Sequence, residues 1–157
     1  MNTKRQIYVT ESDDRRLRTL LSSQNPQVMN YSRLLDTLRT ELDSAIVIAS
    51  GDIPRDVVTM NSKVILTDLD IGETVVCTLV FPANSDSERN KISILAPVGA
   101  ALIGRRIKDS IDVYAPAGRK LFRIDGILSR SSTHKAAYEP NSRRTESQQF
   151  SLERSQP

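Results

Sequence analysis

A strand, a proline corner and a short helix are predicted in direct succession over residues 92–110, and this succession limits the fold more than any other stretch. It opens with a run of apolar residues, which indicates the end of a buried strand. Pro97 disfavours helical geometry in the residue before it, so the strand should stop there. Apolar residues then recur at helical spacing from Val98 to Leu102, and Gly104 stands where glycine commonly ends a helix. We therefore expect Leu102 to be buried between a short helix and a sheet.

In the N-terminal part of the chain, apolar residues twice follow a helical period, which predicts two helices. The first begins at Thr10, where T-E-S-D is similar to a capping box with Asp13 in place of the usual Glu. The second should run from Tyr31 to Ala49, because its leucines alternate spacings of three and four, as in a two-helix coil. Its apolar C-terminal end is expected to dock on the following domain. The connection at 22–30 is short and contains an Asn-Pro turn, so the helices should lie antiparallel.

After the boundary marked by Gly51 and Pro54, the hydrophobic period changes to two, which predicts strands. The predicted strands cover residues 57–60, 64–66, 74–81, 91–95, 111–114 and 121–127, with turns at 69–72 and 82–90. The last part of the chain is rich in Ser, Arg, Gln and Glu and has few apolar anchors, so we expect it to be disordered. The predicted fold class is therefore α+β. It has a helical hairpin at 1–51, an antiparallel sheet domain at 52–128 and a disordered tail at 129–157.

The charge balance of the chain limits its partners. Lys and Arg number 22 against 19 Asp and Glu, a net charge of +3, which is small for a protein that contacts many nucleic-acid phosphates. We interpret Arg15, Arg16 and Arg18 on the first helix as a solvated surface rather than a binding patch. No run of residues is apolar and long enough to span a bilayer, so no membrane partner is expected. The single Cys77 lies among valines, as a small buried hydrophobe would, and fits a reducing cytoplasm.

No pattern in the sequence predicts catalysis, a metal or a cofactor. The only histidine, His134, lies in the predicted tail, away from any Ser or Cys that it could activate. Asp68, Asp70 and Glu73 are interpreted as turn residues between strands rather than metal ligands. Gly99 and Gly104 have the spacing of a phosphate-binding loop, but the Lys and Ser/Thr that must follow are absent. We therefore expect a protein that is not an enzyme.

Two motifs in the sheet region resemble those of a known family. The first is AP-x-G-x-ALIG at 96–104, followed by D-S-I at 109–111 and AP-x-G at 115–118. It resembles the C-terminal domain of the Gre transcript-cleavage factors, the GreA/GreB family of transcription elongation factors. The second, DVVTMNSKV at 56–64, is similar to the signature of the related Rnk family, called regulators of nucleoside diphosphate kinase. The resemblance covers 52–128 and extends more weakly over the N-terminal helices.

This resemblance implies an FKBP-like sheet domain and RNA polymerase as the partner. In Gre factors the globular domain docks at the mouth of the polymerase secondary channel, on a helical pair of the β′ subunit. Their helical hairpin enters the channel, and two acidic residues at its tip hold a magnesium ion that stimulates cleavage of backtracked RNA. The present sequence departs from them at the tip, because 22–30 contains no Asp or Glu. Its first helix, of about a dozen residues, would also be short, ~18 Å.

We therefore predict a bacterial Rnk-type regulator that binds RNA polymerase at the secondary-channel mouth and has no transcript-cleavage activity. Contact with DNA would be only indirect, through the polymerase. The corner formed by Ala96, Pro97, Val98 and Gly99 aligns with the Gre loop that meets the polymerase. Pro97 would present a rigid apolar knob, and Gly99 would let a partner approach closely. The alternative interpretation of the corner is that it only joins a strand to a helix.

Other functions remain open at this point. The Rnk resemblance suggests regulation of nucleoside diphosphate kinase, either directly or through its expression. A domain that self-associates through its hairpin is a third hypothesis. Prolyl isomerase activity, which an FKBP-like fold brings to mind, is not predicted, because fold alone does not imply function. The aromatic lining that such a pocket needs is also missing, since aromatic residues make up 4% of the chain and Trp is absent.

Overall fold

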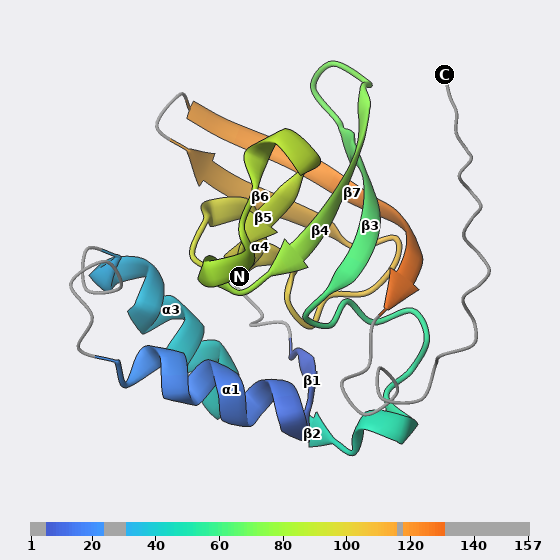
Figure 1. The fold of residues 1–157 in the computed structure, drawn as a ribbon. Helices are drawn as coiled ribbons and strands as arrows, with labels where there is room; N and C mark the ends of the chain where they lie inside the picture. Colours follow the sequence, from blue (N-terminus) through green and yellow to red (C-terminus); the bar gives the residue numbers. More distant parts are fainter. Residues whose placement is uncertain (1–5, 24–30, 116–117, 131–157) are drawn as a thin grey trace.

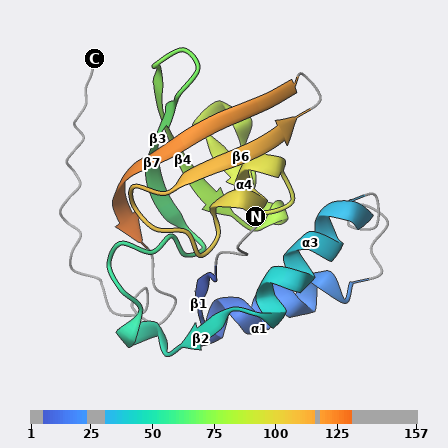
Figure 2. The same ribbon diagram turned by 180° about the vertical axis from the view of Figure 1, so that it is seen from behind.

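The computed structural model describes residues 6–23, 31–115 and 118–130 and confirms the α+β class (Figure 1). A helical hairpin lies beside a curled sheet, and a short helix packs against that sheet (Figures 1 and 2). In chain order the helices and strands are β1 (Tyr8–Thr10), α1 (Glu11–Leu21), α3 (Ser32–Asp43), β2 (Ile46–Ile48), β3 (Ser62–Asp68), β4 (Thr74–Val80), β5 (Lys91–Ser93), α4 (Pro97–Leu102), β6 (Ser110–Ala115) and β7 (Gly118–Arg130). Short 3-10 turns occupy Ser50–Asp52, Pro82–Asn84 and Ser87–Arg89.

The hairpin forms because α1 and α3 each bury one apolar stripe. Leu17 and Leu21 of α1 and Leu38 and Leu42 of α3 are all buried, as their helical spacing predicted. The helix start at Thr10 is also confirmed, since the Thr10 hydroxyl accepts a hydrogen bond from the backbone N–H of Asp13 at 3.0 Å. The two helices run antiparallel (Figure 1).

The second helix ends earlier than predicted. α3 stops at Asp43, and Ile46–Ile48 forms strand β2, which pairs in parallel with β1. Two physical reasons explain the difference. Ile46, Val47 and Ile48 are all β-branched, which favours extended backbone over helix. The apolar N-terminal segment also supplies a pairing partner, because the Ile46 N–H donates to the Ile7 carbonyl at 2.9 Å. The prediction of a helix to Ala49 was therefore wrong.

The described part of the sheet domain is built on five strands in the order β5-β4-β3-β7-β6. All neighbours are antiparallel except β4 and β5, which are parallel. Two register shifts interrupt the pairing of β3 with β7, and such bulges increase local twist and bend the strand. The sheet therefore curls around its core, where Leu79, Leu102, Ile103 and Ile124 are fully buried.

Several strand boundaries differ from the sequence prediction. Residues 57–60 form no strand beyond an isolated bridge between Val57 and Arg106, because Asn61 takes a left-handed conformation with φ of 69° and turns the chain. β5 ends at Ser93 rather than Leu95, since the Ser93 hydroxyl accepts a bond from the Leu95 N–H. β7 continues through Ser129 to Arg130, into the predicted tail. The rest of that tail, and with it His134, lies outside the described residues.

The turn between β3 and β4 forms as predicted. Gly72 has φ of 76°, a conformation that favours glycine. The Asp68 carboxylate accepts a hydrogen bond from the Asp70 N–H and forms an ion pair with Lys120 at 2.7 Å. The hydrogen bond from Lys120 lowers the pKa of the Asp68 carboxyl. The carboxylate of Asp68 thus stabilises the turn. Elsewhere in the sheet, Cys77 is buried as expected, and burial raises the pKa of its thiol to about 11.

Candidate functional site

The corner between β5 and α4 is held by local hydrogen bonds. The Ala96 N–H donates to the Ser93 carbonyl at 2.9 Å, and the Ala100 N–H donates to the Ala96 carbonyl at 2.9 Å. Ala96 is extended, and Pro97 takes the first helical position of α4, where a missing N–H costs nothing and the fixed φ suits the helix. The backbone of the corner is therefore held by hydrogen bonds on both sides of Pro97, which begins α4.

The residues of the corner differ in exposure, so some of them are accessible to a partner and others pack inside the chain. Pro97 is exposed, Ala96 and Val98 are partly buried, and Gly99 is buried. A Cβ atom on Gly99 would overlap the carbonyl oxygen of Ser93. The close approach that Gly99 permits in this structure is therefore to its own chain, while its contact with a partner stays a prediction. The sequence correctly indicated that this position needs a glycine, and the structure gives packing against Ser93 as the reason.

The DVVTMNSKV segment (56–64) holds the C-terminal end of α4, the helix that follows the corner. Gly104, with φ of 76°, ends α4 as predicted. Its N–H donates to the Val58 carbonyl at 2.9 Å, and the Val58 N–H donates to the Arg105 carbonyl at 2.8 Å. The DVVTMNSKV motif thus has a structural role that sequence reasoning did not foresee, because it fixes the end of α4.

The same motif joins the sheet domain to the hairpin. Asp13 of α1 accepts a hydrogen bond from the backbone N–H of Met60 at 2.9 Å, and both residues are buried. Burial raises the pKa of the Asp13 carboxyl, against the opposing effects of the Met60 hydrogen bond and the charge of Arg16. A second link is the ion pair between Arg105 and Glu41 of α3, at 3.5 Å, whose side chains are only 18% and 19% exposed. The two parts of the molecule therefore meet through polar contacts as well as apolar ones.

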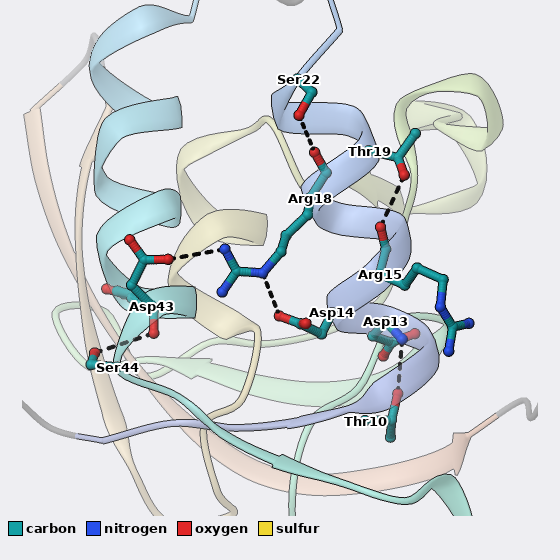
Figure 3. A network of polar contacts seen from close by, with 10 residues as sticks. Thr10, Asp13, Asp14, Arg15, Arg18, Thr19, Ser22, Asp43 and Ser44 are labelled. Carbon is teal, nitrogen blue, oxygen red and sulfur yellow. Dashed lines mark hydrogen bonds and ion pairs between the residues drawn. The ribbon is translucent and has the colours of Figure 1, made fainter.

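The three arginines of α1 have different environments. Arg18 bridges the hairpin, because its guanidinium contacts Asp14 at 3.0 Å and Asp43 at the end of α3 at 2.9 Å (Figure 3). Arg16 lies over the ring of Phe81, 4.2 Å from its centroid, and so contacts the sheet domain. Arg15 points away from α3, and in Figure 3 only its backbone carbonyl takes part in a marked contact, with the Thr19 hydroxyl. The interpretation of all three as a merely solvated surface was therefore incomplete.

A groove of about 960 Å³ runs between α1 and the segment that follows β4, and Ala96 is the one corner residue in its lining. Its lining includes Arg15, Arg16, Leu20, Tyr31, Phe81 and Ala96. We call this feature the hairpin–sheet groove. Sequence reasoning missed it, because it depends on how two elements far apart in the chain pack together. The only available signal was the arginine cluster on the first helix.

Metal, membrane and aromatic-pocket sites each have requirements that can be compared with the described residues. They contain no group of three or more His, Cys, Asp or Glu that could hold a metal ion. None of their helices is long and apolar enough to cross a bilayer. Tyr114, one of the few aromatic residues of the sheet domain, is 71% exposed, so it does not line an enclosed pocket. Of the predicted hairpin tip, Ser22 and Ser23 are described, and residues 24–30 lie outside the described part.

Comparisons with known proteins identify the family. The sequence model described as "Transcription elongation factor, GreA/GreB, C-term" matches residues 53–128, and the model "Rnk N-terminus" matches residues 5–48. The solved structure of a "Prokaryotic transcription elongation factor GreA/GreB from Nitrosomonas europaea" is 37% identical. The structural match covers 80% of this chain and 100% of the Nitrosomonas europaea chain, with a TM-score of 0.65. The chain belongs to the GreA/GreB family. This result confirms the resemblance inferred from the two motifs, and it confirms the Gre-type fold of the sheet domain.

Within the GreA/GreB family, curated relatives of two kinds resemble the chain. A "Regulator of nucleoside diphosphate kinase" from Escherichia coli is 46% identical over 85 residues, which are 54% of this chain and 62% of that protein. A "Transcription elongation factor GreA" from Clostridium beijerinckii is 37% identical over 109 residues, 69% of this chain and 67% of that protein. The chain thus spans less than two thirds of the first of these relatives. Both relatives bear names of regulators or elongation factors.

Proposed function

We propose that this GreA/GreB family member is a cytoplasmic regulator that binds RNA polymerase at the rim of the secondary channel. It would occupy the site of cleavage-stimulating Gre factors without stimulating cleavage itself. The β′ helical pair that receives the globular domain of Gre factors is the expected contact. The family membership supports the polymerase as partner, and the geometry of the corner supports the surface.

The observation that carries this proposal is the exposure of Pro97 on a rigid support. Pro97 projects from a corner whose backbone is fixed by hydrogen bonds on both sides. A rigid apolar side chain loses little conformational entropy when a partner covers it. Ala96 and Val98 extend the same surface, while Gly99 acts beneath it by allowing the chain to pass Ser93. Of the corner residues predicted as a site, Ala96, Pro97 and Val98 are thus proposed to contact the polymerase.

The absence of cleavage activity is proposed from the composition of the tip. Residues 22–30 contain no Asp or Glu, and carboxylate oxygens are the ligands that magnesium prefers in proteins. The two helices of the hairpin are also short, with 11 residues in α1 and 12 in α3. A helix of this length extends only ~16–18 Å, which limits how far the tip could reach into a channel.

The second candidate function is regulation of nucleoside diphosphate kinase. It is favoured by one observation, the 46% identity to a protein that carries this name. A purified kinase should then bind the chain directly, or its activity should change when the chain is added. If the effect on the kinase acts through gene expression, neither change would be seen with purified proteins, and only binding to the polymerase would remain.

A single substitution tests the proposed surface. Pro97→Asp places a charge on the exposed knob, and an acidic residue at the first position of a helix is compatible with α4. We expect it to weaken binding to purified RNA polymerase about tenfold, or about 1.4 kcal/mol. Ile71→Asp is the matched control, because Ile71 is a 61% exposed apolar residue in the turn between β3 and β4. A thermal melt shows whether the Pro97→Asp protein is folded. If it is folded and binds the polymerase as tightly as the control, the corner is not part of the interface.

A further inference from the structure

The hairpin–sheet groove has an apolar floor. Leu20 of α1, Phe81 and Pro82 after β4, and Ala96 of the corner all line it, and each of them is partly buried. Tyr31 also lines it and is 44% exposed. An aliphatic or aromatic side chain of a partner would find apolar contacts on this floor, as anchors of protein interfaces do.

The charge of the groove has one sign. Among the described residues that line it, the charged ones are Arg15 and Arg16, and neither Asp nor Glu is present. The nearest carboxylates along the chain have partners of their own, because Asp14 pairs with Arg18 at 3.0 Å and Asp86 with Arg89 at 3.7 Å. Arg16 already covers the Phe81 ring. Arg15 is exposed and forms no ion pair with any described residue, so its charge is available to a partner.

The chain itself does not provide a complementary occupant. Residues 131–157, the segment that follows β7, contain four Lys or Arg against three Glu, so their net charge is positive. The whole chain carries +3, so a second copy is not favoured on charge either. Electrostatic complementarity selects a partner segment with net negative charge.

We propose that the hairpin–sheet groove receives an acidic segment of RNA polymerase, in which a carboxylate meets Arg15 and an adjacent apolar side chain rests on the floor formed by Leu20 and Phe81. This inference rests on the proposed function and extends the contact surface from the corner onto α1. Because Ala96 belongs both to the corner and to the groove, one continuous partner surface could cover the two. The hairpin would then help to recognise the polymerase through α1, independently of the hairpin tip.

The test compares two charge reversals in the full chain by titration against purified RNA polymerase. Arg15→Glu reverses the available charge, and Lys63→Glu is the matched control, because Lys63 is exposed on β3, lies outside the groove lining and has no ion pair with a described residue. We expect Arg15→Glu to weaken binding about tenfold and Lys63→Glu to change it less than about twofold. Arg15→Lys, which keeps the charge, should retain most of the affinity. Raising the salt concentration should weaken polymerase binding by the wild type more than binding by Arg15→Glu, because salt screens an ion pair that only the wild type forms.

The possible failures can be told apart. If the wild type does not bind the polymerase, the proposed function is wrong and this inference falls with it. If the wild type binds and Arg15→Glu binds equally well, the groove is wrong while the proposed function stands. A dimer in sedimentation that Arg15→Glu dissociates would assign the groove to a second copy and would also overturn the inference.

Discussion

The buried contact between Asp13 and Met60 predicts different losses of stability for two substitutions of Asp13. Asp13→Ala removes the acceptor and leaves the Met60 N–H without a protein partner in a buried position. Asp13→Asn keeps an acceptor oxygen of the same shape and removes the negative charge. Asp13 is 8% exposed and Met60 1%, and the hydrogen bond measures 2.9 Å, so solvent can replace the carboxylate only in part.

The magnitude follows from the cost of an unpaired buried amide. Asp13→Ala should lower the free energy of unfolding by about 1–3 kcal/mol. A cavity of about 100 Å³ beside Asp13, Met60 and Arg130 can admit a water molecule, which would place the loss toward the lower end of this range. Asp13→Asn should stay within about 1 kcal/mol of the wild type, because it keeps the acceptor and avoids burying a charge.

The assay is urea denaturation of the three proteins at several pH values. Since burial raises the folded-state pKa of Asp13 above 3.8, the folded protein takes up this proton before the unfolded chain does as the pH falls. Wild-type stability relative to Asp13→Asn should therefore increase as the pH falls from neutral through the folded-state pKa, and level off below the unfolded pKa. Equal stabilities of the Ala and Asn variants at neutral pH would show that the Met60 hydrogen bond contributes nothing to stability.

Three further predictions concern stability. Leu102→Ala should lower the free energy of unfolding by ~2–5 kcal/mol, because Leu102 is fully buried between α4 and the sheet; a loss below about half a kilocalorie in urea denaturation would contradict this packing. Removal of residues 131–157 should leave the thermal melt nearly unchanged, since their composition offers few apolar anchors. A truncation that also removes Arg130 should lower the melting temperature, because Arg130 donates to the carbonyls of Pro54 and Val57 at 2.8 and 3.1 Å.

Local sequence signals predicted local structure well. The cap at Thr10, the corner at Pro97, the helix end at Gly104 and the turn at Gly72 each depend on neighbouring residues, and the structure confirms all four. The strand at Ile46–Ile48 was missed because its apolar run fits either a helix or a strand until the N-terminal segment supplies a partner.

The contacts that shape the candidate site depend on residues far apart in the sequence. The T-E-S-D pattern placed Asp13 in a capping box, yet its carboxylate accepts a bond from Met60, 47 positions away. The role of Gly99 also became clear only when the Ser93 carbonyl was seen beside it. The groove arises from the packing of α1 on the segment after β4, and the contact of Arg16 with Phe81 has no signature in the sequence.

One assay measures both whether this chain occupies the Gre site on RNA polymerase and whether it stimulates cleavage there. Backtracked elongation complexes are incubated with the chain alone, and then with a fixed amount of a cleavage-stimulating Gre factor and increasing amounts of the chain. We expect no added cleavage with the chain alone and a progressive loss of Gre-stimulated cleavage, which excess Gre factor restores. Cleavage that depends on the chain would show that it is itself a cleavage factor, and Gre-stimulated cleavage that is unaffected by saturating amounts of the chain would show that it does not occupy the Gre site.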